Sequence, residues 1–296
     1  MRAPLASIDG RRPHSRLYLA PPGLQGAIVA LVCRDTTGFA LTDAQRLSHF
    51  PASPLICLSW FDGVDAGIVE CNAGHTVWRP YESAFMLSGS QARPMVSWGR
   101  ESGRGGMICF EADAARALFD LDLSAIQDRI VPAEPLLGPA WQPFLDALIA
   151  ADSDAMALCV LEQHLAARWR ALTGRGSALA PLREAGRYWV ERLAWQAHEW
   201  RRTHGSRQVE RRIKAYSGRS LREWQSLVKT ESLFFSARDR FEAGRALDWA
   251  ALAQDEGFAD QAHLSRAVKR TTGFSPSEFT QRFLEDESFW AYRLWV

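Results

Sequence analysis

Apolar positions in the C-terminal third of the chain recur three and four residues apart, the spacing of one face of an α-helix. Two segments with this spacing carry the same short pattern, offset by 55 residues, with Arg and Lys lying off the apolar face. In each segment a glycine follows the last apolar position and is suited to the left-handed conformation that ends a helix. The matched positions are Val209, Arg211, Ile213, Lys214, Gly218, Ser220, Glu223 and Trp224 in the first segment, and Leu264, Arg266, Val268, Lys269, Gly273, Ser275, Glu278 and Phe279 in the second.

The second segment also carries signals for the start of helices. Asp260 is placed to cap a helix that runs to Thr272, and Ser275 with Pro276 and Glu278 predicts a capping box for the next helix. The pattern therefore favours two helix-turn-helix units. The alternative, an all-helical repeat protein, needs about three units to bury a continuous core, and only two are found.

The N-terminal region follows a different pattern, with short apolar runs separated by Gly, Pro, Asn or Asp, which predicts β-strands. A barrel or a sandwich fits this spacing. The expected strands are 27–33, 55–61, 67–71, 76–79, 85–88, 94–98 and 106–110.

Helices are expected next, at 112–119, 141–151 and 155–172. In the last two, helical spacing links Trp141, Leu145 and Leu148, and then Met156, Val160, Gln163 and Ala167. This hairpin packs either on the β region or on a second copy of the chain, and the sequence does not choose between the two.

The predicted fold is therefore α+β, an N-terminal β domain with a helical hairpin followed by an all-α domain. We place the N-terminal β domain and its hairpin at 1–175, the all-α domain at 182–285, and an aromatic tail at 286–296. The best linker candidate is 173–181, which is rich in Gly and Ser.

Charge is distributed unevenly along the chain, although the net charge is only +1. Between positions 201 and 245, 12 residues are Lys or Arg and 5 are Asp or Glu. Such a local excess of positive charge suits contact with phosphates, and the alternative is a solvated helix face.

Metal, cofactor and membrane functions find little support in the sequence. The five cysteines are scattered without a C-x-x-C pair, and His49, His75, His164 and His204 lack the spacing of metal ligands. The start of the chain has no apolar signal region, and no apolar run reaches the ~18 residues of a membrane span. We expect a cytoplasmic protein with no metal, cofactor or membrane partner.

One run of residues in the second unit is specific enough to indicate a family. It comprises Ala253, Gly257, Phe258, Asp260, Gln261, Leu264, Ser265, Arg266, Lys269, Arg270, Gly273, Ser275, Pro276 and Phe279. This run resembles the signature of the AraC/XylS family of bacterial transcription regulators, and the resemblance covers about the last hundred residues. It implies two helix-turn-helix units on a long joining helix, each with a recognition helix in the major groove of double-stranded DNA. The first unit departs from the pattern with Gly205 where the family usually has a serine cap.

The resemblance also assigns roles to individual residues. It places base contacts at Arg207, Glu210 and Arg211 in the first unit, and at Gln261, Ala262, Ser265 and Arg266 in the second. Arg212 lies beside the first set. We assign phosphate contacts to Lys214 and Lys269, and His263 fits either a base or a phosphate.

For the N-terminal domain, the resemblance implies a β-barrel that binds a small-molecule effector and mediates dimerisation. Trp60, Trp78 and Trp98 fall on expected strands and are candidates for lining an apolar pocket, with core packing as the alternative. The expected partners are DNA, an effector, a second copy of the chain and, for an activator, RNA polymerase.

Two other classes of function remain as alternatives. One is an architectural DNA-binding protein with little sequence preference, and the other is an enzyme whose β domain carries the activity. No G-x-S-x-G elbow, P-loop or dinucleotide-binding G-x-G-x-x-G is present, so we assign no catalytic residue.

Overall fold

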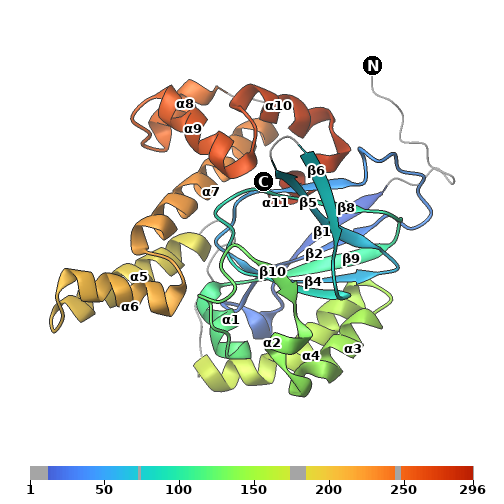
Figure 1. Ribbon diagram of the computed structural model, residues 1–296, viewed down its shortest axis with the longest axis horizontal. Helices are drawn as coiled ribbons and strands as arrows, with labels where there is room; N and C mark the ends of the chain where they lie inside the picture. Colours follow the sequence, from blue (N-terminus) through green and yellow to red (C-terminus); the bar gives the residue numbers. More distant parts are fainter. Residues whose placement is uncertain (1–12, 73–74, 174–184, 244–247, 296) are drawn as a thin grey trace.

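Two antiparallel β-sheets form the N-terminal part of the chain in a computed structural model that describes residues 13–72, 75–173, 185–243 and 248–295 (Figure 1). The six-stranded sheet has the order β1-β2-β9-β4-β7-β10, and the four-stranded sheet has the order β3-β8-β5-β6. The strands are β1 (His14–Leu19), β2 (Ile28–Asp35), β3 (Leu47–Phe50), β4 (Ile56–Asp62), β5 (Ala66–Asn72), β6 (His75–Pro80), β7 (Phe85–Ser88), β8 (Met95–Gly99), β9 (Arg104–Phe110) and β10 (Ile130–Pro132).

The expected α+β class is confirmed, but the β part is not a closed barrel. Closure requires every strand to pair on both sides. Among the described strands, β1 and β10 are edges of one sheet and β3 and β6 are edges of the other, and no ladder joins the sheets. The domain is therefore an open pair of sheets.

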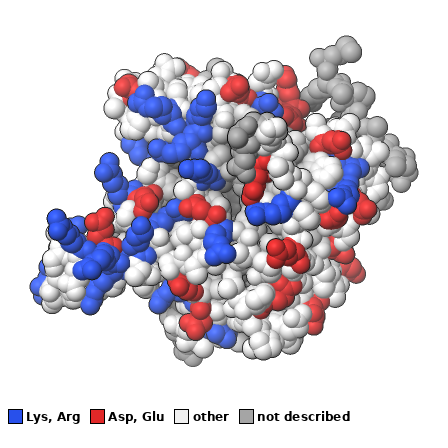
Figure 2. Space-filling model, in the orientation of Figure 1, with Lys and Arg blue, Asp and Glu red and all other residues white. Residues whose placement is uncertain are grey.

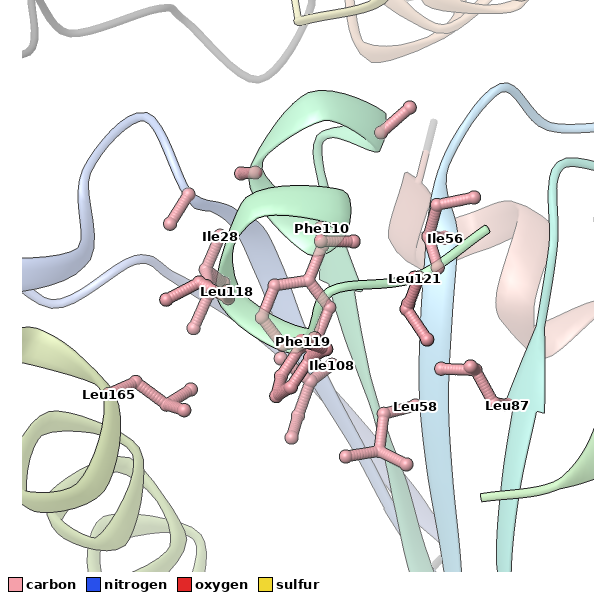
Figure 3. Packing of buried hydrophobic residues seen from close by; sticks show 14 of the residues in the cluster. Ile28, Ile56, Leu58, Leu87, Ile108, Phe110, Leu118, Phe119, Leu121 and Leu165 are labelled. Atoms are coloured by element: carbon pink, nitrogen blue, oxygen red, sulfur yellow. The ribbon is translucent and has the colours of Figure 1, made fainter. Parts of the chain in front are cut away.

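A helical layer covers one face of the six-stranded sheet. It consists of α1 (Ala112–Phe119), α2 (Glu134–Leu137), α3 (Gln142–Ile149) and α4 (Asp154–Thr173). Figure 3 shows Leu118 and Phe119 of α1 and Leu165 of α4 packed toward the apolar side chains of β2, β4 and β9. This cluster is the larger core of the molecule.

The predicted hairpin of α3 and α4 packs on this sheet of its own chain. Trp141, Leu145 and Leu148 are buried as expected, but α4 buries a different face from the one expected. Met156 and Gln163 are exposed, whereas Ala157, Leu161 and Leu165 are fully buried. The expected stripe was wrong because α4 is apolar on more than one side, so spacing alone does not identify the buried face.

The C-terminal helices form two units on one long helix. The helices are α5 (Ala185–Arg201), α6 (Ser206–Ser217), α7 (Leu221–Glu242), α8 (Trp249–Asp255), α9 (Gln261–Thr272), α10 (Pro276–Glu285) and α11 (Trp290–Trp295). In Figure 1, α7 runs between the unit of α5 and α6 and the unit of α8, α9 and α10. The expected linker, 173–181, lies almost entirely outside the described residues.

The ends of these helices follow the repeated pattern closely. Gly218 and Gly273 end α6 and α9 with φ of 82° and 85°, which a side chain with a Cβ would resist. α10 begins with the predicted capping box of Ser275 and Glu278. Ser220 and Glu223 exchange the same pair of hydrogen bonds at the start of α7. The hydrogen bonds to Glu278 from the backbone and side chain of Ser275 hold the pKa of that carboxyl below its usual value.

The aromatic tail docks on its own chain. Phe289 and Tyr292 are buried in the core of the second unit, while Trp290 and Ala291 pack against Val32 of β2. The indole Nε1 of Trp290 donates to Ser48 Oγ at 2.8 Å. The tail therefore joins the second helical unit to the β-sheets.

We predict that Leu264→Ala will strongly destabilise the second unit, because Leu264 is fully buried in its core. Leu-to-Ala changes at such sites cost about 2 to 5 kcal/mol of unfolding free energy. Leu284→Ala is the matched control, since Leu284 is 42% exposed. Chemical denaturation followed by circular dichroism would measure both, and equal effects would contradict the assigned core.

Candidate nucleic-acid interface and effector cavity

In the first unit, the exposed face of α6 is basic and its buried face is narrow and apolar. Val209 and Ile213 are buried, and Ser217 is buried with its hydroxyl bonded to the Ile213 carbonyl. Gly205 caps the helix without a side-chain hydrogen bond, as the sequence indicated. The predicted contact residues of this unit are all exposed: Arg207, Glu210, Arg211, Arg212 and Lys214.

In the second unit, α9 also has a basic exposed face and an apolar buried face. Unlike α6, it has a side-chain cap at its N-terminus. Asp260 Oδ1 accepts from the His263 N–H at 2.6 Å, and Leu264, Ala267 and Val268 are buried. The predicted contact residues Gln261, Ala262, His263, Arg266 and Lys269 are exposed, and Ser265 is half-buried. The imidazole of His263 packs edge-on to Phe258 with ring centroids 5.3 Å apart.

Positive charge gathers over both units on one face of the molecule. In Figure 2, Lys and Arg cluster over the α8–α9 region and over α5 and α6, at the left of the view. Arg270, at the end of α9, is also exposed and donates to Ser226 Oγ of α7 at 3.1 Å. Two basic surfaces on one face are what a protein needs to contact the phosphates of one duplex.

The first unit is fixed to the β domain by a buried arginine. Arg219, whose side chain is only 7% exposed, donates to the hydroxyl and carbonyl oxygens of Ser90 at 2.9 and 2.7 Å, and to Asp128 at 2.8 Å. Burial favours a higher pKa for Asp128, but its hydrogen bonds from Arg219 and the Ala92 N–H outweigh it and lower the pKa. Gln127 also donates to the Ser217 carbonyl, so the turn after α6 is held from two sides.

The second unit is fixed to the same domain at the C-terminal end of α9. The Ala52 N–H donates to the carbonyl of Thr271 in α9 at 2.9 Å. His49 of β3 packs against the rings of Phe274 and Phe289, with centroids 5.4 and 5.0 Å apart. Neither unit is therefore a free module in this arrangement.

A cavity of about 140 Å³ lies between the two sheets and is walled partly by Trp290 of the tail. The guanidinium of Arg34 lies 4.7 Å from the centre of the Trp290 ring and pairs with Glu287 at 3.3 Å. Burial lowers the pKa of Arg34 to about 10, against the opposing effect of Glu287. The mainly apolar lining includes Val32, Phe50, Phe61, Met86, Met95 and Met107.

The three tryptophans expected at a pocket do not line this cavity. Trp60 is buried in the core on the helix-covered side, with its ring against Gly106. Trp78 and Trp98 pack edge-on to each other at 5.5 Å. The expectation for Trp60 was wrong because successive side chains of β4 point to opposite faces of the sheet. Ser59 and Phe61 face the cavity, so Trp60 faces away from it.

A second, smaller cavity of about 70 Å³ lies where the sheets meet α7 and the tail. Its lining includes Phe50, Phe235, Tyr292 and the carboxyl-bearing Glu231 of α7. Burial raises the pKa of Glu231 to about 8. Sequence analysis missed Glu231, Arg219 and Trp290, because their roles depend on contacts between distant segments that no local pattern records.

In the described part of the chain, no group of three His, Cys, Asp or Glu side chains is arranged to hold a metal ion. None of the helices there has the length and apolar content needed to cross a membrane.

Comparison with known proteins gives only distant similarity. No family model matches the chain, and no curated protein matches it. The chain is similar to the structure of ToxT from Vibrio cholerae, with 12% identity, 90% of this chain and 97% of that chain covered, and a TM-score of 0.38. It is also similar to unsaturated fatty acid-bound ToxT from strain SCE256, with 13% identity, 79% and 93% covered, and a TM-score of 0.37. At these values the similarity assigns no function to this chain.

We predict that Glu231→Gln will stabilise the protein at alkaline pH and have little effect in acid. A carboxyl whose pKa is raised by folding binds its proton more tightly in the folded state. Its contribution to stability is therefore complete below about pH 4.5 and lost as pH rises through about 8. Thermal unfolding of both proteins across this range would measure the difference. A constant difference in melting temperature would contradict the prediction, and exposed Glu285→Gln is the control.

Proposed function

We propose that this chain is a sequence-specific DNA-binding transcription regulator of the AraC/XylS type. The observation that carries the proposal is a pair of helices, α6 and α9, whose exposed faces are basic. The buried face of each packs in its own hydrophobic core, and the single helix α7 joins the two units. An enzyme or a purely structural helical domain has no need for two matched basic helices on one face.

The length of α7 supports contact with successive turns of one duplex. Its 22 residues span about 33 Å at 1.5 Å per residue. B-DNA repeats about every 34 Å, so two recognition helices separated by one turn would enter neighbouring major grooves. A helix with both ends held by separate cores is stiff enough to keep that spacing.

The side chains of α9 offer the more selective chemistry. Arg266 can form two hydrogen bonds with guanine, and Gln261 can do so with adenine. Ser265 is half-buried but keeps a hydroxyl near the same face. In α6, Arg207, Glu210 and Arg211 take the positions of Ala262, Ser265 and Arg266, and Arg212 and Lys214 supply phosphate contacts.

Control by a small molecule is the second part of the proposal. The cavity between the sheets is walled by Trp290, and the neighbouring tail residues Phe289 and Tyr292 belong to the core of the second unit. A ligand that binds one arrangement of the tail better than another would therefore shift how the second unit is held. A regulator that activates would also contact RNA polymerase.

Selection from a pool of random duplexes tests the function most simply. The proposal predicts recovery of a short consensus with two conserved segments. Recovery of unselected sequences, together with tight binding, would instead identify an architectural DNA-binding protein.

We predict that Arg266→Ala will weaken binding at the selected site by about 1 to 3 kcal/mol and relax the preference at one base position. Quantitative binding to the consensus and to single-base variants would measure both effects. Arg170→Ala is the matched control, since Arg170 is exposed on α4, away from both units. Equal losses on every sequence would reassign Arg266 to a phosphate contact.

We predict a different outcome for Lys214→Ala and Lys269→Ala, because a lysine that contacts only phosphate carries no sequence information. Each change should weaken all duplexes alike and reduce the slope of log K against log salt by about one phosphate. Titrations at several salt concentrations would show this. A slope equal to that of the unmodified protein would exclude the phosphate role.

A further inference from the structure

The smaller cavity differs from the larger one in charge. Among its described lining residues, Glu231 is the only Asp, Glu, Lys or Arg, whereas Arg34, Arg46 and Glu101 line the larger cavity. Both arginines are already engaged: Arg34 pairs with Glu287, and Arg46 donates to backbone carbonyls of Leu41 and Arg100. Glu231 has no such partner among the described residues.

Glu231 is placed where three parts of the chain meet. It projects from α7, and a Cβ built at Gly186 of α5 would lie 2.6 Å from its Oε2, so the carboxylate lies directly against that glycine. The same point is 3.3 Å from Pro54 of the β domain. The carboxyl thus lies between the β domain, α5 and α7.

A partly buried carboxylate without a partner is costly, and it can avoid the cost by taking a proton or a counter-ion. Burial raises the pKa of Glu231 to about 8, so the carboxyl holds its proton at neutral pH unless a counter-ion pairs with it. Cys57 and Tyr292 are the other lining groups that can titrate, and neither supplies positive charge.

The rest of the lining suits an organic cation. Phe50, Phe235 and Tyr292 present aromatic rings, and the faces of such rings attract ammonium groups. Met95 and Met107 add polarisable, adaptable surface. A hydrated metal ion would have only one carboxylate ligand among these lining residues, and the three aromatic rings would not coordinate it.

The two cavities adjoin, since Phe50, Ser88, Met95 and Met107 line both. We propose that the effector is a hydrophobic amine, whose ammonium group pairs with Glu231 while its apolar body extends into the larger cavity between the sheets. This inference rests on the proposed effector role of the larger cavity. It adds that α7, the helix joining the two DNA-binding units, contacts the effector directly.

Isothermal titration of the full-length protein with three matched compounds tests the charge of the ligand. The compounds are 4-phenylbutylamine, the neutral 4-phenylbutanol and the anionic 4-phenylbutyrate. At about pH 7 the amine should bind about tenfold more tightly than the alcohol, because only the amine gains a counter-ion. Binding should also release protons to the buffer, because Glu231 must ionise to form the pair.

Two variants separate a specific ion pair from a general effect. Glu231→Gln should abolish the preference for the amine and its proton release, while leaving binding of the alcohol unchanged. Glu285→Gln, at an exposed site on α10, should behave as the unmodified protein.

The remaining outcomes overturn the proposal in distinguishable ways. Equal binding of amine and alcohol, or tighter binding of the acid, would show that the cavity accepts ligands but that Glu231 does not select an amine. Binding of none of the three compounds would reject the amine effector. Recovery of a DNA consensus would be unaffected by either result, so the DNA-binding function is tested separately.

Discussion

The helix α7 is the element on which the rest of the C-terminal structure depends, because it belongs to two hydrophobic cores at once. Trp224 and Leu227, near its start, pack in the core shared with the first unit and the β domain. Leu233 and Ala237, further along, pack in the core of the second unit. An uninterrupted helix anchored in both cores fixes the distance and the rotation between the two basic helices. In the proposed function, this fixed separation combines the two basic surfaces into one DNA-binding interface.

The β domain constrains both units through different contacts. Arg219 ties the first unit to Ser90 and Asp128, while Thr271 and the aromatic tail tie the second unit to β3 and its neighbours. The tail lines both cavities through Trp290 and Tyr292, and α7 lines the smaller one through Glu231 and Phe235. Under the proposed function, a ligand would need to favour one arrangement of these elements by only a few kcal/mol to shift the population of DNA-competent molecules.

Local sequence signals predicted the helical half well and the β half only in part. Caps such as Asp260, Gly273 and the Ser275–Glu278 box are determined within one helical turn, so both ends of α9 and the start of α10 are predicted to the residue. The strands β1, β3 and β10 were missed, because each lies at a sheet edge where one side of pairing is absent and the apolar pattern is weak. Trp60 shows a second limit, since alternation predicts two faces of a strand but not which one lines a cavity. Arg219, Glu231 and the tail depend on contacts between segments distant in sequence, which periodicity does not encode.

In the proposed function, α6 and α9 enter neighbouring major-groove turns on one face of a duplex. Hydroxyl-radical footprinting on the selected site, with the protein bound, tests this arrangement most directly. We expect two protected segments whose centres are about one helical turn, or about 10 base pairs, apart on the same face of the DNA. A single protected segment, or two segments on opposite faces, would contradict it.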